Sequence, residues 1–265
     1  MPKLALLQAT GTPGDVGANL AALRDAAGRA TAEGASLLIT PEAFVTGYDI
    51  GAATLGALAE PLDGPCLSEA ARIAADLGIA IVAGWAERSG DRVFNAATLF
   101  DRAGRPVLTH RKAHLYGAID HAAFAPGEAF ATAEIDGLRV GLLVCFDIEF
   151  PEPARALALA GAQLIAVPTS LMAPDDVIAR TVVPARALEN QVFVAYANRI
   201  GREATLDYVG QSTVAGPDGA VIAVAGATEE TLLLADIDPA AIAVERARHD
   251  YLAERRPSLY GTLTT

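Results

Sequence analysis

Residues 138–152 read Leu-Arg-Val-Gly-Leu-Leu-Val-Cys-Phe-Asp-Ile-Glu-Phe-Pro-Glu, an apolar run that ends in a cysteine and an acidic turn. Leu138–Val144 has the length and composition of a buried β-strand. The Ala-rich stretch Pro153–Ala160 before Gly161 predicts a helix, and Leu164–Val167 predicts a second strand. This order of strand, helix and strand predicts an α/β fold.

The same alternation extends toward both ends of the chain. Further strands are predicted at Leu4–Gln8, Ser36–Thr40, Ile79–Gly84, Val93–Phe100, Pro106–His110, Phe193–Asn198, Gly210–Ala215, Ala220–Ala225 and Thr231–Asp236, and further helices at Ala18–Glu33, Leu67–Leu77 and Val177–Asn190. The turn sequences Ala103-Gly104 and Pro217-Asp218-Gly219 predict two hairpins. Because no linker or low-complexity segment interrupts this pattern, we expect a single domain over residues 1–265.

The composition fits a globular enzyme and excludes some classes of function. Hydrophobic residues make up 52% of the chain, which is enough to bury a large core. The formal net charge of −12 argues against a nucleic-acid partner, since such binding depends on Lys and Arg that neutralise phosphates. No stretch approaches the ~20 apolar residues that cross a membrane, and the apolar start at Met1–Gln8 is shorter than a signal peptide. We therefore expect a cytoplasmic protein with no membrane partner.

Three polar residues follow predicted apolar strands, at the ends where α/β proteins tend to place reactive groups. Glu42 follows the apolar triplet at 37–39, Lys112 follows Val107-Leu108, and Cys145 ends the strand quoted above. A cysteine that attacks an amide needs a base for its proton and a cation for the developing oxyanion. Glu42 and Lys112 match these two roles.

Cys145 has two interpretations from its local sequence. The transition from strand to turn beside a helix start favours a thiolate nucleophile, whereas a lone cysteine is also a common small buried hydrophobe. The second interpretation fits the other cysteine, Cys66, which precedes an Ala-rich helix. His114 and His121 offer a competing Cys–His dyad, but they lie in a Gly- and Ala-rich loop without metal-ligand spacing. We interpret both histidines as structural or pocket-lining residues.

The sequence around the three strand-end residues resembles the signature blocks of the nitrilase superfamily. The blocks are Pro41-Glu42 with Thr46-Gly47-Tyr48, Arg111-Lys112-Ala113-His114-Leu115, and Val144-Cys145-Phe146-Asp147. The resemblance continues through Gly84-Trp85-Ala86-Glu87, Phe124-Ala125-Pro126-Gly127, Ala185–Asn190, Asn198 and Gly216-Pro217-Asp218-Gly219. Membership implies a four-layer α-β-β-α sandwich, the catalytic triad of Glu42, Lys112 and Cys145, and neither cofactor nor metal.

The resemblance also implies a reaction and a homodimer. The implied reaction is attack of Cys145 on an amide carbonyl, while Lys112 and the backbone N–H of Phe146 hold the oxyanion. Hydrolysis of the resulting thioester then restores the thiol. In the family a C-terminal extension packs across a two-fold axis, and residues 245–265 resemble that extension.

The chain departs from the family pattern at the carboxylate that follows the lysine. Many relatives have a second glutamate there, which positions the substrate or assists proton transfer. Asp120 stands at that position here, and its side chain is one methylene shorter, so its reach to Lys112 is in question. Glu128 is the alternative supporting carboxylate.

The pair Ile148-Glu149 bears on the substrate. Relatives that hydrolyse N-carbamoyl amino acids have arginines there to bind the substrate carboxylate, so this chain resembles instead the aliphatic amidases, notably bacterial 5-aminopentanamidases. We hypothesise that Glu149 or Asp120 recognises a substrate ammonium; otherwise Glu149 caps a helix or pairs with Arg186. Three further residues are expected to line the acyl pocket: Tyr48, Thr169 and Ser170.

Other functions remain open at this point. An amidohydrolase that acts on an N-carbamoylamine, such as N-carbamoylputrescine, uses the same triad and the same cationic tail, and a nitrilase uses the same triad. A catalytically silent small-molecule binder would be expected to lack at least one triad residue. We interpret the chain as a cysteine-dependent amidase that converts a small aliphatic carboxamide, with an ω-amino group as one option, to a carboxylic acid and ammonia.

Overall fold

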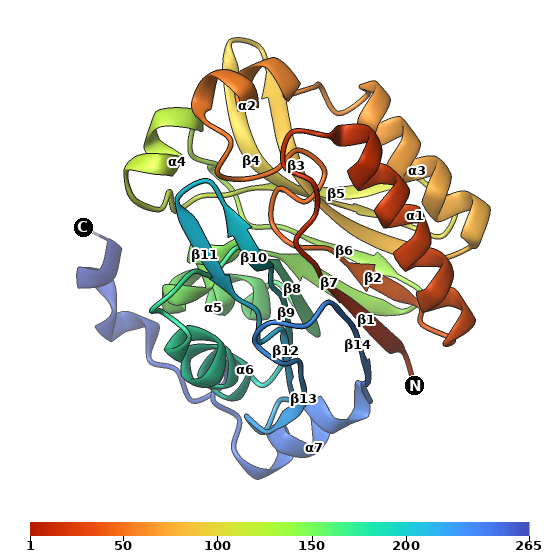
Figure 1. The fold of residues 1–265 in the computed structure, drawn as a ribbon. Coiled ribbons are helices and arrows are strands. Elements are labelled where there is room, and N and C mark those ends of the chain that lie inside the picture. Colours follow the sequence, from red (N-terminus) through yellow and green to blue (C-terminus); the bar gives the residue numbers. More distant parts are fainter. Residues whose placement is uncertain (265) are drawn as a thin grey trace.

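The computed structural model describes residues 1–264, which form two six-stranded sheets that face each other (Figure 1). The first sheet contains β1 (Lys3–Gln8), β2 (Leu37–Ile39), β3 (Ala80–Ser89), β4 (Arg92–Phe100), β5 (Pro106–Arg111) and β14 (Thr231–Asp236), and the second contains β6 (Thr132–Ile135), β7 (Leu138–Leu142), β8 (Leu164–Pro168), β9 (Phe193–Ala197), β12 (Thr213–Ala215) and β13 (Val221–Val224). The strand orders are β14-β1-β2-β3-β4-β5 and β13-β12-β9-β8-β7-β6. Strands β1 to β3 and strands β7 to β9 run parallel within their sheets.

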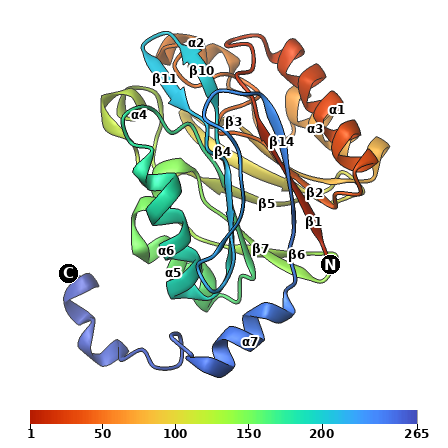
Figure 2. The ribbon, with the colours of Figure 1, turned by 60° about the horizontal axis from the view of Figure 1, so that its bottom comes forward.

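Helices cover the outer face of each sheet. Helices α1 (Val16–Ala32) and α3 (Pro65–Leu77) pack on the first sheet, and α5 (Pro151–Leu159) and α6 (Val183–Asn190) pack on the second (Figure 2). The predicted four-layer α-β-β-α sandwich is therefore confirmed.

Both sheets are buried on two sides because their strands alternate between two cores. In β1, Leu4 and Leu6 pack in the core between the sheets, whereas Ala5 and Leu7 pack against the helices of the outer layer. Such strands read as continuous apolar runs, which is why the sequence identified them readily.

The structure contains short elements that the sequence pattern did not predict. They are β6, α2 (Ala52–Leu58), α4 (Gly117–Ala123), the hairpin of β10 (Ile200–Glu203) and β11 (Leu206–Val209), and α7 (Ala240–Arg248). Helices α2 and α4 have seven residues each and no side-chain N-cap, so the usual start signal is missing. Strands of four residues, such as β10 and β11, are too short for a clear alternation.

The helix predicted at Val177–Asn190 is divided in the structure. A π-helical segment spans Ile178–Val182, and α6 then begins at Val183 with Pro184 in its first turn. Proline has no N–H and its ring clashes with the carbonyl four residues earlier, so it interrupts regular helical bonding at this point. Among residues 1–264, no helix is both long enough and apolar enough to cross a bilayer.

Candidate active site

The three predicted catalytic residues meet where strands from both sheets end. Glu42 lies just after β2, Lys112 follows β5 directly, and Cys145 begins a 3₁₀ turn, Cys145–Glu149, after β7. The side chains of Glu42 and Lys112 are 0% exposed, and Cys145 is 6% exposed. The backbone N–H of Glu42 donates to the Thr169 carbonyl just after β8 (3.2 Å), which joins the two sheets beside the site.

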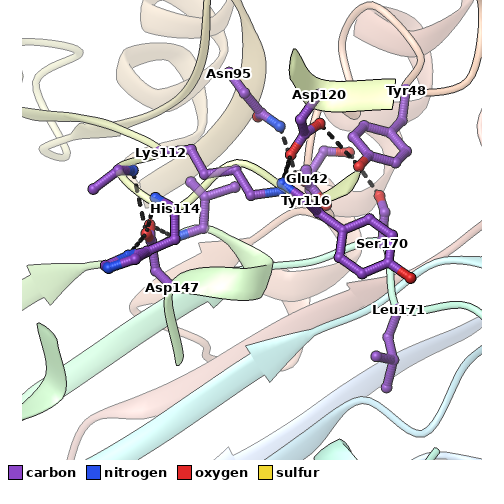
Figure 3. A network of polar contacts seen from close by, with 12 residues as sticks. Glu42, Tyr48, Asn95, Lys112, His114, Tyr116, Asp120, Asp147, Ser170 and Leu171 are labelled. Carbon is purple, nitrogen blue, oxygen red and sulfur yellow. Dashed lines mark hydrogen bonds and ion pairs between the residues drawn. The ribbon is translucent and has the colours of Figure 1, made fainter. Parts of the chain in front are cut away.

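Lys112 lies between two carboxylates (Figure 3). Its Nζ donates to Oε1 of Glu42 (2.8 Å) and to Oδ2 of Asp120 (2.7 Å), and the centre of the Tyr48 ring lies 5.7 Å from Nζ. Burial lowers the pKa of Lys112, but the nearby Glu42, Cys145 and Asp120 outweigh it and hold this pKa well above its usual value. The lysine is therefore a cation at neutral pH.

Glu42 has one engaged and one free carboxylate oxygen. Its Oε1 accepts hydrogen bonds from Lys112 and from Nδ2 of Asn95 (2.7 Å), whereas its Oε2 is buried and has no hydrogen-bond partner among residues 1–264. Burial raises the pKa of Glu42 against the opposing effect of Lys112. A carboxylate with a free oxygen and a raised pKa is suited to accept a proton.

Asp120 reaches Lys112 despite its shorter side chain, because it lies in the first turn of α4 beside the lysine. Its Oδ1 accepts a hydrogen bond from the Tyr48 hydroxyl (2.9 Å), and its Oδ2 also accepts one from the backbone N–H of Tyr116 (2.8 Å). Both oxygens are thus engaged by protein donors. Glu128, the alternative supporting carboxylate, is 84% exposed on the surface and does not join this network.

Cys145 adopts a left-handed backbone conformation (φ 46°), which non-glycine residues rarely adopt and which is often found at functional positions. Burial and the charge of Glu42 raise the pKa of the thiol, although Lys112 and contacts from Thr169 and Ser170 lower it. Of the two interpretations of the local sequence, the thiolate is therefore not supported by the surroundings of the sulfur. The group is a thiol at neutral pH and needs a base.

Asp147 ties the Cys145 turn to the loop that carries Lys112. Its Oδ1 accepts a hydrogen bond from the backbone N–H of His114 (2.9 Å) and lies 2.8 Å from His114 Nδ1, and its Oδ2 lies 2.8 Å from His110 Nε2. Burial acts to raise the pKa of Asp147, but the hydrogen bonds from His110 and His114 outweigh it and hold this pKa well below its usual range. The carboxylate is a fixed buried anion.

The positions of His114 and His121 argue against the alternative of a Cys–His dyad. The His114 ring faces Asp147 and stacks on Phe150, with ring centroids 4.2 Å apart. His121 lies on the exposed side of α4. Neither position supports a role as the base for Cys145.

Two further acidic side chains, Glu149 and Asp175, lie near Tyr116, which is itself close to Cys145 and Lys112. We call Tyr116, Glu149 and Asp175 the rim. All three side chains are half-buried. Burial and the neighbouring Asp175 raise the pKa of Glu149 to about 7. Burial and the same two acids raise the pKa of Tyr116. Arg186 does not pair with the Glu149 carboxylate as one alternative held; it donates instead to the Glu149 backbone carbonyl (2.6 Å).

The three predicted pocket residues are buried and have different partners. The hydroxyl of Tyr48 is engaged by Asp120, and Oγ of Ser170 donates to the backbone carbonyl of Glu42 (3.4 Å). The side chain of Thr169 is buried beside the thiol, and its contact with the thiol lowers the pKa of Cys145.

Sequence reasoning missed Asn95 and Asp175. Asn95 lies within the apolar strand β4, and a buried amide in such a run is a signal that a polar partner lies opposite. Asp175 lies in the loop after β8, where an isolated acid carries no local signal. The described part of the chain has no cluster of three or more His, Cys, Asp or Glu side chains that could hold a metal.

Comparison with known proteins agrees with this geometry. The model of the carbon-nitrogen hydrolase family matches residues 3–246. The chain belongs to the carbon-nitrogen hydrolase family. It is 47% identical over 264 residues to the protein named "Hydrolase in pqqF 5'region" of Pseudomonas protegens, covering 99% of this chain and 92% of the relative. It is 36% identical over 263 residues to an (R)-stereoselective amidase of Pseudomonas sp, covering 99% and 94%.

Solved structures of one amidase are similar over almost the whole chain. The amidase of Nesterenkonia AN1, described as a member of the nitrilase superfamily, is 36% identical with a TM-score of 0.86, covering 99% of this chain and 97% of that one. Two further structures of that amidase, at 36% identity, coverages of 98% and 95%, and TM-scores of 0.85 and 0.84, show the acetamide moiety of fluoroacetamide added covalently at the active-site cysteine and a complex with butyramide. The predicted membership of the nitrilase superfamily is confirmed.

Proposed function

We propose that the protein is an amidase that hydrolyses a small aliphatic carboxamide through a thioester on Cys145. The observation that carries this proposal is the free Oε2 of Glu42, a buried carboxylate oxygen in a site that also holds a protonated thiol. The neighbouring Lys112 supplies a fixed positive charge. Base, nucleophile and cation are the groups that cysteine-based acyl transfer requires.

In the proposed first half-reaction, Glu42 accepts the thiol proton while Sγ of Cys145 attacks the amide carbonyl carbon. The carbonyl oxygen becomes an oxyanion, held by Lys112 and the backbone N–H of Phe146. Collapse of this intermediate breaks the carbon–nitrogen bond, and the departing nitrogen takes the proton from Glu42 and leaves as ammonia. In the second half, Glu42 removes a proton from water, which attacks the thioester. The carboxylic acid leaves, and the proton returns to the sulfur.

The decisive experiment measures ammonia and carboxylic acid released from a panel of aliphatic amides. We expect equimolar release by the wild type and loss of release in Cys145→Ser. The matched control is Cys66→Ser, because Cys66 is the other cysteine and is also buried. Unchanged turnover in Cys145→Ser would refute the proposal. Ammonia accompanied by carbon dioxide from an N-carbamoylamine would instead support the carbamoylamine alternative.

For the substrate, we propose an ω-amino amide whose ammonium lies at the rim. Asp120 is ruled out as its partner in this proposal, because both of its oxygens are engaged by Lys112, Tyr48 and Tyr116. Glu149 remains, with Asp175 near enough to raise its pKa. The C145A variant of the Nesterenkonia amidase binds butyramide, a short aliphatic amide. We expect an amino group at the far end of such a chain to lie at the rim.

Comparison of 5-aminopentanamide with pentanamide tests this substrate. At pH 8 the wild type is expected to prefer the amino amide, and Glu149→Gln is expected to lose that preference while its kcat/KM for pentanamide is unchanged. The control is Glu152→Gln, an exposed acid on the neighbouring helix α5. Equal specificity constants for both amides in the wild type would exclude the ammonium site.

We also infer a homodimer through α5, α6 and the segment after α7. Large apolar side chains are exposed on this face, namely Leu159, Leu188, Leu259 and Tyr260. The segment after α7 runs along the same side of the molecule as α5 and α6 (Figure 2). Thr265, the last residue of the predicted 245–265 extension, lies outside the described residues. Light scattering tests the inference: a molar mass near 27.3 kDa, that of one chain, would refute it.

A further inference from the structure

A buried arginine that the proposed mechanism does not use lies beside the backbone of Glu42. Arg199 follows β9 and is 0% exposed. Its guanidinium donates to the backbone carbonyl of Glu42 (3.1 and 3.2 Å), to that of Ala43 (2.9 Å) and to that of Thr10 (2.7 Å). A buried charge is tolerated only when such hydrogen bonds replace its hydration. The arginine is therefore committed to the turn that carries Glu42.

The turn that Arg199 holds is conformationally demanding. Ala43 has a left-handed backbone (φ 46°), which strains a residue with a Cβ atom. The turn also lies directly against Gly84 of β3: a Cβ atom on Gly84 would come within 2.3 Å of the Pro41 carbonyl oxygen and 2.8 Å of the Ala43 nitrogen. A strained conformation persists only where its surroundings enforce it, and here β3 and the guanidinium do so.

The same guanidinium is paired with Glu203 of β10, at 3.3 Å, and both side chains are buried. Glu203 also accepts hydrogen bonds from the backbone N–H of Tyr48 (3.1 Å) and from the hydroxyl of Tyr208 (2.6 Å). The side chain of Tyr48 in turn donates to Asp120, which lies beside Lys112. The ion pair thus contacts the segments that support both carboxylates around the lysine.

We propose that Arg199 and Glu203 are positioning residues of the active site, which fix Glu42 and Tyr48 relative to Lys112. This inference rests on the proposed role of Glu42 as the base. A buried ion pair gains little net stability, because desolvation offsets much of the attraction. The planar guanidinium, however, can hold two consecutive carbonyls in one geometry, which a lysine cannot. The pair therefore serves the geometry of the site more than the stability of the fold.

The primary test is Arg199→Lys, which keeps the charge and removes the planar fork. A displaced catalytic group can lower the rate about 100-fold, so we expect kcat to fall about 10- to 100-fold while KM changes less than about 3-fold. Because Lys112 lowers the pKa of Glu42, a loosened contact moves the acidic limb of the kcat/KM profile to higher pH. The control, Arg202→Lys, changes an exposed arginine that pairs with Asp207 across the same hairpin, and it leaves both quantities unchanged.

A second variant and a second measurement separate positioning from folding and from the proposed activity. Glu203→Gln keeps an acceptor oxygen and is expected to change kcat in the same direction by a smaller factor, and it decides the question if Arg199→Lys does not fold. Alkylation of Cys145 by iodoacetamide, located by peptide mass spectrometry and followed against pH, reports on Glu42 without amide turnover.

A shifted pH profile of alkylation, in a variant that unfolds at the wild-type urea midpoint, supports the positioning role. This holds even if the wild type hydrolyses no amide, because that result would count only against the proposed function. Unchanged profiles of alkylation and turnover in the folded variants would overturn the inference.

Discussion

The turn Cys145–Glu149 carries two carboxylates in opposite surroundings. Asp147 is 0% exposed, and both of its oxygens accept hydrogen bonds from the protein, so its pKa is held well below its usual range. Glu149, two residues later, is half-buried beside another acid, and its pKa is raised to about 7. One carboxylate is fully used to hold the turn in place. The other is available to an external cation.

The same contrast separates the catalytic centre, formed by Glu42, Lys112, Asp120 and Cys145, from the rim. Around Lys112, Glu42 and Asp120 are buried and bound by protein donors, so each is committed to one geometry. At the rim, burial and the neighbouring Asp175 raise the pKa of Glu149, which leaves the protonation of Glu149 sensitive to pH and to a ligand. Changes in the centre should therefore affect all substrates or the fold, and changes at the rim should affect only charged substrates.

The largest effect is expected for Asp147→Asn, which leaves buried donors without an anion. A hydrogen bond to a charged group typically contributes about 1.5–3 kcal/mol, and Asp147 accepts several, so we expect the free energy of unfolding in urea at pH 7 to fall by at least about that amount. The lowered pKa of Asp147 makes this contribution complete above the usual aspartate pKa of about 3.9, and it is lost as pH falls below that value. The exposed control Asp136→Asn should stay within about 0.5 kcal/mol of the wild type. Equal effects of the two substitutions would contradict the contrast.

Lys112→Ala should give the next largest effect. Loss of an oxyanion donor typically lowers kcat about 100- to 1000-fold, and every amide substrate should be affected alike. Lys3→Ala is the natural control, since Lys3 is the only other lysine in the sequence and lies far from the site at the N-terminus. Circular dichroism verifies that both variants are folded. Normal turnover by Lys112→Ala would remove the lysine from the mechanism.

A smaller loss is expected for Asp120→Asn. A hydrogen bond to a charged group contributes about 1.5–3 kcal/mol, which corresponds to roughly 10- to 100-fold in kcat if it is lost in the transition state. Glu128→Gln tests the alternative carboxylate and should have no effect, because Glu128 is exposed. The measurement is steady-state kinetics with pentanamide. A larger loss of kcat in Glu128→Gln than in Asp120→Asn would assign the supporting role to Glu128.

The smallest effect concerns pH at the rim. Glu149 is neutral below its pKa of about 7 and anionic above it, so the preference for 5-aminopentanamide over pentanamide should rise through pH 7. Partly exposed ion pairs contribute up to about 1 kcal/mol, or roughly five-fold. Asp175→Asn removes a like charge and should move the midpoint to lower pH. A preference that is constant between pH 6 and 8 would contradict the rim site.

The strand pattern of the sequence was sufficient for an α/β fold and for placing Glu42, Lys112 and Cys145 after strands, and the family resemblance supplied the four-layer sandwich. Buried strands such as Leu4–Gln8 are continuous apolar runs, and their predicted bounds lie within one residue of the observed strand Lys3–Gln8. The chemistry of Glu42, Lys112 and Cys145 came from motif resemblance, because each residue alone has an ordinary structural explanation.

The residues that hold the site could not be predicted in the same way. Asn95 lies 53 positions from Glu42, and their contact depends on the order of the strands within the first sheet. Arg199 lies 157 positions from Glu42 and follows a strand of the second sheet, so its contact depends on how the two sheets pack. The local sequence left the protonation of Cys145 open for a related reason: burial and the charge of Glu42 raise its pKa, and neither is visible in the local sequence. Short elements such as α4, which places Asp120, carry no cap signal.

The most direct test of the central claim is mass spectrometry of protein quenched in acid during turnover of pentanamide. The account predicts one acyl group per chain on the peptide that contains Cys145, none on Cys66, and little or no acylation in Glu42→Gln. Continued turnover without an acyl group on Cys145, or acylation of Glu42→Gln at the wild-type rate, would contradict it.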